Sequence, residues 1–352
     1  MKIICITGLP LSAPTIESRL IPLISNLREH RFELIIPKSS GVWKEKEYRQ
    51  KLPDHISLVE YGSKFIYPFF SIKKNLFKDF DVVYVSKLSR LSSLPGYVLS
   101  KIKGKPLIVD CDDYDWSSGP ISNKIIGNFV IKHNDHLITA SKELNKRYGG
   151  TYIPNTTDLN KFNPRKYNGK KIRKKYGIKP TEKIIIWPGI LHSIVDIKFL
   201  AEIGNKLKES RLIIVGSGDK FEKLKENVTS KRVILAGMVS KDEMPNYYAA
   251  ADIGVITFPK TDYHMCKCPI KLFEYMAMEL PIFTTPVGEP KYMVEKTKCG
   301  FICETPQGFV DRIESTPKSE LVKLGKMGRK YLEKNQNWKI LSKKLKTLLS
   351  NI

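Results

Sequence analysis

Residues 268–288 read CPIKLFEYMAMELPIFTTPVG, which combines the start of a helix with a short apolar strand. Pro269 predicts the helix start, because proline fits the first helical position, where its missing donor costs nothing. The first amides of such a helix, at the positive end of its dipole, favour an anionic ligand. Lys271 could contact a phosphate there, and the Glu274 carboxylate could accept hydrogen bonds from a ribose. The stretch therefore predicts a sugar-nucleotide site.

Strand and helix patterns alternate through the rest of the second half. Short apolar runs predict buried parallel strands, because strands covered on both faces are continuously apolar. These strands are expected at residues 183–187, 212–215, 233–235, 253–257, 282–285 and 300–303. Helical patterns separate them, at residues 196–208, 221–227, 241–250, 269–278 and 289–296. Repeated strand and helix units predict a doubly wound α/β domain.

The first half shows the same alternation. Its strands are expected at residues 2–7, 32–36, 81–85, 106–110, 136–139 and 152–153, with helices at 14–28, 94–103 and 123–132. We therefore predict an N-terminal Rossmann-like domain over residues 1–165 and a second one over 166–335. A last helix within 336–352 has one apolar face opposite lysines. We expect it to pack back on the N-terminal domain, with a membrane surface as the alternative.

The chain of 352 residues carries a formal net charge of +24. Such a charge attracts anionic lipid surfaces, nucleic acid or phosphorylated substrates, although a solubility effect or a lysine-rich composition explains it equally well. No apolar run approaches the roughly 20 residues that span a bilayer. The first apolar run, at residues 3–6, ends too soon for a signal peptide. We expect a cytoplasmic protein that is peripheral at the inner membrane face.

Six cysteines lie mostly in or beside apolar runs, which favours buried thiols in a reducing compartment. Cys266 and Cys268, together with Cys299 and Cys303, could supply four thiolates to zinc. Only one residue separates the first two, however, and Cys303 ends a strand-like run. Packing is the preferred interpretation, and we expect no metal.

Glycines follow two of the strands expected in the second domain. Gly216 and Gly218 would let backbone approach a nucleotide closely, and the alternative is an ordinary turn. Gly237, Met238 and Val239 follow the next strand, where they could present backbone groups to a nucleobase or form a plain loop.

Two segments of the first domain follow strands at their carboxyl ends, where open α/β sheets bind ligands. Residues 8–15 follow the first strand, and Arg19 one helical turn further on could meet an anionic acceptor group. Residues 110–115 read DCDDYD. Carboxylates this close repel one another when buried, which raises a pKa unless they are solvated or paired. They are therefore expected to be solvated, paired or used in chemistry.

Several motifs, in this order and spacing, resemble the retaining family 4 glycosyltransferases. Those of the second half are Gly189, LIIVGSG at 212–218, VILAGMV at 233–239, MPNYYAAAD at 244–252 and PIKLFEYMA at 269–277. Those of the first half are HLITAS at 136–141 and IPNTTDLNKFNP at 153–164. Asn337 and Trp338, just before the last helix, are similar as well. The resemblance covers nearly the whole chain and implies the GT-B fold, an α/β fold with two Rossmann-like domains facing across a cleft.

The resemblance also implies roles for particular residues. The donor is expected at Gly8, Gly189, Gly216, Gly218, Gly237, Met238, Val239, His264, Cys266, Pro269, Ile270, Lys271 and Glu274. Lys271 would contact the diphosphate and Glu274 the ribose. Asp112 or Asp113 would replace a histidine that many relatives carry beside the donor sugar. These four side chains are the expected catalytic residues. The acceptor is expected at Pro10 and Arg19.

The chain departs from the family pattern at three places. Cys266 stands eight positions before Glu274, where the family has a glutamate that reaches the donor sugar. Ile190 and residues 195–196 occupy the place of a basic pair, so Lys271, His192 or Lys198 would have to supply the positive charge. Glu279 replaces a small residue after the signature helix.

The leading hypothesis is a retaining glycosyltransferase that moves a sugar from a nucleoside-diphosphate sugar to a glycan or lipid-linked acceptor. This activity would serve surface polysaccharide or glycolipid assembly, with no cofactor, no metal and no dedicated protein nucleophile. An anionic membrane surface is a candidate partner. The alternatives are a catalytically reduced relative acting as a binding subunit and a sugar-nucleotide epimerase of the same fold. Nucleic acid is not an expected partner, because no nucleic-acid module is present.

Overall fold

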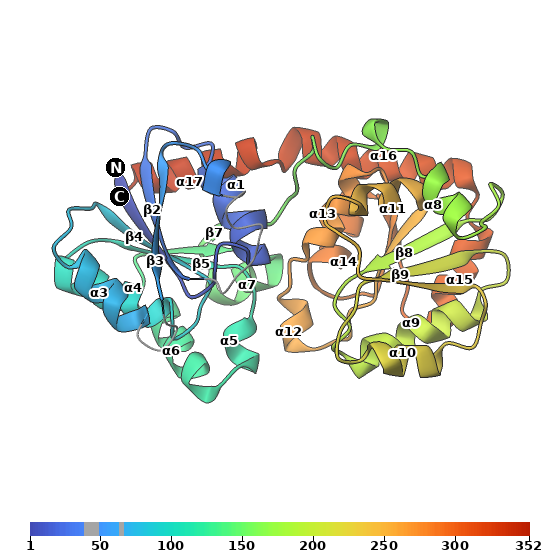
Figure 1. Cartoon of the computed structure of the whole chain (residues 1–352), viewed down its shortest axis with the longest axis horizontal. Helices are drawn as coiled ribbons and strands as arrows, with labels where there is room; N and C mark the ends of the chain where they lie inside the picture. Colours follow the sequence, from blue (N-terminus) through green and yellow to red (C-terminus); the bar gives the residue numbers. More distant parts are fainter. Residues whose placement is uncertain (39–48, 63–66) are drawn as a thin grey trace. The chain divides into compact units, whose positions relative to one another are not determined.

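The computed structural model describes residues 1–38, 49–62 and 67–352, which form two compact units. Unit 1 consists of Met1–Asn155, Cys266–Cys268 and Trp338–Ile352. Unit 2 consists of Thr156–Met265 and Pro269–Asn337. Each unit is built around one sheet with helices on its faces (Figure 1).

The sheet of unit 1 has the strand order β3-β2-β1-β4-β5-β6-β7, and all its strands are parallel. The strands are β1 (Lys2–Thr7), β2 (Arg31–Pro37), β3 (Ile56–Tyr61), β4 (Val82–Ser86), β5 (Leu107–Cys111), β6 (His136–Thr139) and β7 (Thr151–Tyr152). The order reverses at β1, so the carboxyl ends of β1 and β4 form the topological switch point, where such sheets bind ligands.

Helices cover both faces of this sheet. They are α1 (Ile21–Ile24), α3 (Tyr67–Asn75), α4 (Ser93–Lys103), α5 (Asp115–Ser118), α6 (Ile121–Lys132), α7 (Lys142–Tyr148) and α17 (Trp338–Ser350). Alternate residues of β1 point to opposite faces, so Ile3 belongs to one core cluster and Ile4 to the other. The first cluster includes α1 and the apolar face of α17, and the second includes residues of α3, α4, α5 and α6. Figure 1 shows α17 beside α1, and the two helices are in contact.

Two local features of unit 1 differ from the sequence predictions. The edge strand β3 was not predicted, because Ser57 and Glu60 interrupt its apolar run. The single helix expected over residues 14–28 is a π-helical segment, Ile16–Leu20, that continues into the short helix α1. The predicted parallel sheet is confirmed, with one strand more than expected.

The sheet of unit 2 is also parallel, with the order β10-β9-β8-β11-β12-β13. Its strands are β8 (Ile184–Pro188), β9 (Arg211–Val215), β10 (Val233–Gly237), β11 (Ile253–Ile256), β12 (Ile282–Thr284) and β13 (Gly300–Ile302). Its helices are α8 (Lys170–Lys175), α9 (Ile194–Lys206), α10 (Phe221–Asn227), α11 (Met244–Ala250), α12 (Asp262–Met265), α13 (Ile270–Ala277), α14 (Gly288–Thr297), α15 (Pro306–Ser315) and α16 (Lys318–Asn335). All six predicted strands are present, which confirms a second doubly wound domain. Within the described ranges, no helix is both long and apolar enough to cross a bilayer.

Candidate active site

Three glycines lie together where β8, β9 and β10 of unit 2 end. The amide of Gly216 donates to the carbonyl of Gly237 at 2.8 Å, and the amide of Gly189 donates to Val215 at 2.9 Å. Gly216 has a φ of 134°, and a Cβ there would lie 1.9 Å from the carbonyl oxygen of Gly189. Only glycine fits this position. Gly189, Gly216 and Gly237 thus form a tight run of backbone without side chains at the ends of the three strands, as close approach to a nucleotide requires. We call these three residues the glycine edge.

Helix α13 begins beside this edge. Pro269 is its N-cap and has an extended backbone, and no side chain caps the helix. The Lys271 ammonium donates to the carbonyl oxygen of Pro188 at 2.5 Å and lies 4.2 Å from the centre of the Trp187 ring. A Cβ on Gly189 would lie 3.0 Å from this ammonium. The structure therefore brings the predicted cation, the helix start and the glycine edge together within unit 2.

Glu274 lies one turn after Lys271 and is half-buried. The hydroxyl of Tyr248 on α11 donates to its carboxylate at 2.6 Å. Burial raises the pKa of Glu274, while this hydrogen bond and the charge of Lys271 act in the opposite direction. A polar partner beside a half-buried carboxylate holds it in one orientation, ready to accept further hydrogen bonds.

Tyr248 and Tyr275 were not predicted as site residues. The hydroxyl of Tyr275 donates to the carbonyls of Ile186 and Val255, at 3.2 and 3.1 Å, which fixes α13 to β8 and β11. Its ring packs edge to face on Tyr248, with 5.6 Å between the centroids. Both tyrosines stand in apolar runs, so the sequence shows them only as core residues. They act as positioning residues, because they hold the helix and the carboxylate in place.

Other predicted donor residues lie around the same sheet. Met238 follows β10 and has three quarters of its surface exposed, and Val239 is half-buried. His264 is half-buried on α12, and the hydroxyl of Thr261 lies 2.8 Å from its Nδ1. A Cβ on Gly288 would lie 2.7 Å from the carbonyl oxygen of His264, so this short helix lies close to the start of α14.

His192 was offered as a replacement for the missing basic pair. Its Nδ1 lies 2.6 Å from the carboxylate of Asp219, which also pairs with Lys220 at 2.8 Å. The hydrogen bonds from Lys220 and then His192 lower the pKa of Asp219 to about 2. The side chain of His192 therefore pairs with the Asp219 carboxylate, whereas the Lys271 ammonium lies beside Gly189. This favours Lys271 as the phosphate contact.

Arg19 of unit 1 has a different environment from the one expected. It is fully buried, and its guanidinium donates to both Asp110 oxygens, with Nη2 2.6 Å from Oδ1. It also donates to Asn155 Oδ1 at 2.9 Å and to the carbonyl of Ile153 at 3.0 Å. The prediction that Arg19 contacts an acceptor is wrong for this structure, because the whole guanidinium is used inside unit 1.

Asp112 and Asp113, predicted as catalytic residues, differ in exposure. Asp112 is buried, accepts a hydrogen bond from Asn155 at 3.1 Å and lies 3.7 Å from Arg19 Nε. Burial raises the pKa of Asp112, while the charge of Arg19 acts in the opposite direction. Asp113 is half-buried. Of the two, Asp113 has more surface for a substrate, and Asp112 is one of the paired carboxylates.

The segment Cys266–Cys268 is part of unit 1, although unit 2 supplies the chain on both sides of it. Cys266 is fully buried in the core cluster that contains Cys111 and Trp116. The Asn155 side chain donates to the carbonyl of Cys268 at 2.8 Å. Cys266 was predicted as a donor contact, and its burial in an apolar core contradicts that prediction.

The remaining cysteines are thiols of the core as well. Burial raises the pKa of Cys299 and of Cys303 to about 11. Among residues 1–38, 49–62 and 67–352, no group of three or more His, Cys, Asp or Glu side chains is placed to hold a metal. The zinc interpretation of the four cysteines thus gains no support.

Gly8 and Pro10 follow β1 at the switch point of unit 1. A Cβ on Gly8 would lie 2.7 Å from Cβ of Leu91, so the first loop packs closely against the segment after β4. Pro10 is half-buried, and its carbonyl accepts from the amide of Ala13 at 3.0 Å. Both residues are in place for a ligand at this edge, and their predicted roles stay predictions.

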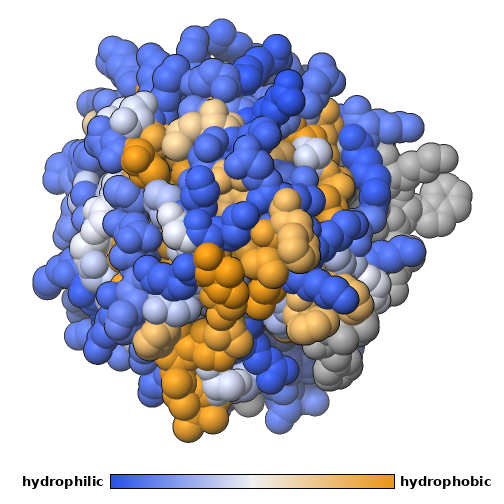
Figure 2. Space-filling model, turned by 90° about the vertical axis from the view of Figure 1, so that its left-hand side faces the viewer, coloured by the Kyte–Doolittle hydropathy of each residue, from blue (hydrophilic) through white to orange (hydrophobic). Residues whose placement is uncertain are grey.

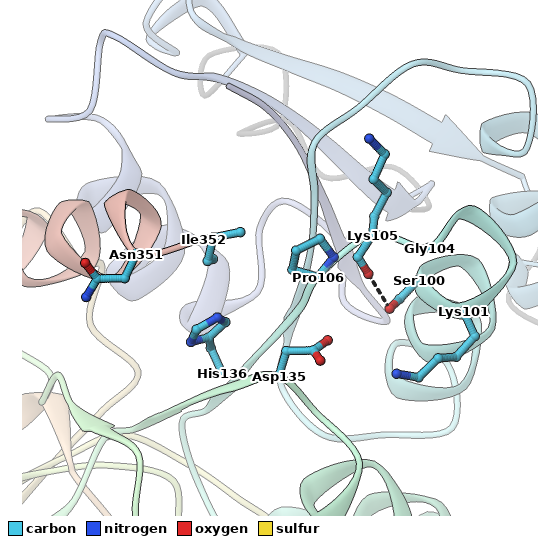
Figure 3. Close-up of a pocket in the computed structure, with 9 residues that line it drawn as sticks. All are labelled: Ser100, Lys101, Gly104, Lys105, Pro106, Asp135, His136, Asn351 and Ile352. Atoms are coloured by element: carbon cyan, nitrogen blue, oxygen red, sulfur yellow. Dashed lines mark hydrogen bonds between the residues drawn. The ribbon is translucent and has the colours of Figure 1, made fainter.

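A pocket of about 440 Å³ lies at the amino-terminal ends of the strands of the unit 1 sheet (Figure 3). Its lining includes Lys105, Pro106, Asp135 and His136, which precede or begin β5 and β6. Figure 3 shows the hydrogen bond from the Ser100 hydroxyl to the carbonyl of Lys105 beside it. Because ligands of open α/β sheets bind at the carboxyl ends of strands, this pocket is not part of the candidate site.

The raised pKa of Glu274 leads to a testable prediction. For Glu274→Gln we expect a melting temperature equal to or above that of the parent, because the variant removes the cost of burying a charge. We also expect at least about ten-fold weaker binding of the donor nucleotide, because a neutral amide is a weaker acceptor than a carboxylate. Calorimetric titration with nucleoside diphosphates and thermal melting measure the two effects. A variant with lower stability and unchanged affinity would assign Glu274 to structure alone.

Comparisons with known proteins match the region of the chain that carries these residues. Residues 182–317, which carry the glycine edge and α13, match the family model described as glycosyl transferases group 1. The UDP-Gal:alpha-D-GlcNAc-diphosphoundecaprenol alpha-1,3-galactosyltransferase of Escherichia coli is 24% identical over 278 residues. This match covers 71% of the chain and 68% of that protein. The putative teichuronic acid biosynthesis glycosyltransferase TuaC of Bacillus subtilis is 26% identical over 160 residues, covering 45% of the chain and 39% of TuaC.

Solved structures match over the full chain. HepE of Anabaena, in complex with UDP-glucose, has a TM-score of 0.78 at 15% identity and covers 100% of both chains. The sucrose-phosphate synthase of Thermosynechococcus elongatus also reaches 0.78 at 16% identity, covering 100% of this chain and 99% of its own. These likenesses show the fold.

The two parallel sheets and these matches define a glycosyltransferase with the GT-B fold. Within that class, residues 182–317 are similar to the group 1 glycosyltransferases.

Proposed function

We propose that this glycosyltransferase takes its sugar from a nucleoside-diphosphate sugar, a UDP-sugar in the first instance, and transfers it to a lipid-linked or polysaccharide acceptor. Two relatives support the proposal by their names. The Escherichia coli relative uses UDP-Gal and a diphosphoundecaprenol-linked acceptor, and the Bacillus subtilis relative is assigned to teichuronic acid biosynthesis. HepE was solved with UDP-glucose.

The observation that carries the proposal is the position of Lys271. Its ammonium lies at the end of β8, on the glycine edge and in the first turn of α13. A diphosphate at this place would meet an ammonium, helix amides and backbone without side chains. Glu274, one turn further along the helix, would accept hydrogen bonds from the ribose.

Catalysis follows from the charge that develops when the sugar leaves the nucleotide. The departing diphosphate gains negative charge, and Lys271 with the first amides of α13 stabilises it more strongly than the intact donor. The acceptor hydroxyl would attack on the face that the diphosphate leaves, which retains the anomeric configuration. A leaving-group oxygen would then take the proton of that hydroxyl. We infer no protein nucleophile and no bound cofactor or metal for this reaction.

Two other candidate functions remain. A catalytically reduced relative would bind the donor without turnover, and the buried Cys266 in place of the expected glutamate is the observation that favours it. An epimerase of the same fold would change the sugar without an acceptor.

A panel of UDP-, GDP- and ADP-sugars separates the three functions. With an acceptor extract, a transferase releases nucleoside diphosphate and forms a glycoside whose anomeric configuration can be read by NMR. We expect turnover of a UDP-sugar with retention. Saturable binding without turnover identifies the reduced relative, and turnover to an isomer of the donor sugar identifies the epimerase.

We place the enzyme at the inner face of a membrane. The net charge of +24 attracts anionic lipid surfaces, and a lipid-linked acceptor lies in such a surface. The six cysteines are buried and form no disulfide, which fits a reducing, cytoplasmic compartment.

A further inference from the structure

We propose that unit 1 docks on an anionic lipid surface through the outer faces of α3, α4 and α6. This inference rests on the proposed function, because a lipid-linked acceptor would reach the enzyme from such a surface. We call the three outer faces together the α3/α4/α6 face.

The three helices form one continuous layer. Helix α3 packs on α4, and α4 packs on α6. Their inner residues, such as Tyr67, Leu99 and Val130, belong to the same core cluster of unit 1. The opposite sides of the helices therefore look outward together and make one surface.

This outward surface carries large apolar side chains. Phe69 and Phe77, on α3 and just after it, are 63% and 87% exposed. On α6, Ile121 and Ile125 are 77% and 63% exposed, and Phe129 continues the same row at four-residue spacing. Four-residue spacing places the three α6 residues along one side of that helix. A row of this kind is normally found facing a core, whereas here it faces outward.

Contacts between the helices connect the apolar residues. The ring of Tyr97 on α4 packs edge to face against Phe129 on α6, with 5.0 Å between the centroids. Leu94 and Ile102 of α4 are 43% and 58% exposed. Figure 2 views unit 1 from the left-hand side of Figure 1. Hydrophobic side chains gather in the lower half of this view, with hydrophilic ones around them.

The charge of the three helices has a single sign, whereas the segment after α3 that carries Phe77 also carries the exposed Asp79. Helices α3, α4 and α6 contain no aspartate or glutamate, and their basic residues are Lys73, Lys74, Lys101, Lys103, Lys124 and Lys132. Apolar side chains with lysines among them are typical of surfaces that insert at the interface of an anionic bilayer. The apolar groups enter the acyl boundary while the lysine stems reach the headgroups.

Helix α16 of unit 2 provides a contrast on the same chain. It is also rich in exposed lysines, but Glu320 and Glu333 accompany them, and its exposed large apolar side chains are Val322 and Met327. Positive charge is therefore spread over the protein. The α3/α4/α6 face differs in having more exposed apolar residues and no aspartate or glutamate within its three helices.

Vesicle co-sedimentation of the full chain tests the proposal. Vesicles of phosphatidylcholine alone are compared with vesicles that contain about one third phosphatidylglycerol. We expect binding to the anionic vesicles only. Two variants alter the face: Phe69→Ser/Phe77→Ser/Ile121→Ser/Ile125→Ser removes apolar area, and Lys73→Gln/Lys74→Gln/Lys101→Gln/Lys124→Gln removes charge. Each should lower the affinity for anionic vesicles by about ten-fold or more.

The matched control removes four exposed lysines from α16, as Lys323→Gln/Lys326→Gln/Lys330→Gln/Lys334→Gln. It changes the net charge equally and should lose less than about three-fold. Circular dichroism of every variant checks that it is folded. Equal losses in the two lysine variants would overturn the proposal, because binding would then follow net charge. So would equal binding to neutral vesicles, or a dimer in solution that the apolar variant dissociates.

Measuring donor turnover and vesicle binding separately distinguishes a failure of the docking surface from a failure of the proposed function. Glu274→Gln should still bind anionic vesicles like the parent. The apolar variant should still turn over the donor with an acceptor fragment that lacks the lipid. Vesicle binding without any donor turnover would contradict the proposed function alone, and turnover without vesicle binding would contradict the docking surface alone.

Discussion

Replacing Lys271 with alanine should lower the rate of sugar transfer by about 100- to 1,000-fold, the range measured when one preorganised group that stabilises transition-state charge is removed. The reason is the place of the ammonium, 2.5 Å from the Pro188 carbonyl and beside Gly189 on the glycine edge. The loss should appear mainly in kcat, because charge grows on the diphosphate only as the sugar leaves. Steady-state kinetics with the best donor measures it.

The control for this variant is Lys296→Ala. Lys296 also belongs to unit 2 and lies near aromatic rings, 5.4 Å from the centre of Tyr292 and 5.2 Å from that of Tyr331. The Lys296→Ala variant should have a kcat within about two-fold of the parent. Lys271→Arg should recover part of the lost rate, since the charge is kept and its geometry is changed. An unchanged kcat for Lys271→Ala would show that this lysine does not stabilise the departing diphosphate.

Replacing Arg19 with methionine should destabilise unit 1 by about 3–5 kcal/mol, the cost of leaving a buried charge without its partner. Arg19 is fully buried against Asp110 and also bonds Asn155 and the Ile153 carbonyl. Hydrogen exchange of β1 and β5 in the full chain, together with chemical denaturation, measures the loss. The exposed pair of Arg147 with Glu143 is the control, and Arg147→Met should cost less than about 0.5 kcal/mol.

The loss of stability in Arg19→Met should also depend on pH. The charge of Arg19 opposes the burial that raises the pKa of Asp112, so its removal raises that pKa further. A carboxylic acid with a raised folded-state pKa stabilises the fold when protonated, and this stability is lost as the pH rises. The destabilisation should therefore be smaller near pH 5 than near pH 8. An altered acceptor KM at unchanged stability would instead restore the acceptor role for Arg19.

The parallel sheets could be predicted because their strands are buried on both faces. Strands such as β8 and β9 are continuous apolar runs, and helical patterns separate them, so neighbouring residues alone carry the signal. Strand β3 lies at the sheet edge, and its exposed Ser57 and half-buried Glu60 make it resemble a loop. The placement of Lys271 and Glu274 at the start of one helix could also be predicted, because the signal lies in neighbouring residues, and their roles stay predictions.

The environment of Arg19 could not be predicted in this way. Its partners Asp110 and Asn155 stand 91 and 136 residues further along the chain, and only the folded sheet brings them together. The same holds for Cys266, whose apolar surroundings come from unit 1 although the chain before residue 266 and after residue 268 belongs to unit 2. Spacing along the chain describes a local motif well. It does not show which distant group neutralises a charge or covers a side chain.

The division of unit 1 over three separate stretches of chain sets the order in which the protein can fold during synthesis. Leu341, Leu345, Leu348 and Leu349 of α17 belong to the core that β1 and β2 begin. Unit 2 can therefore complete its own core as soon as residue 337 has left the ribosome. Strands β1 and β2 keep part of their apolar surface uncovered until residues 338–352 have also left the ribosome. The core of unit 1 is thus completed by a segment that follows unit 2 in the sequence.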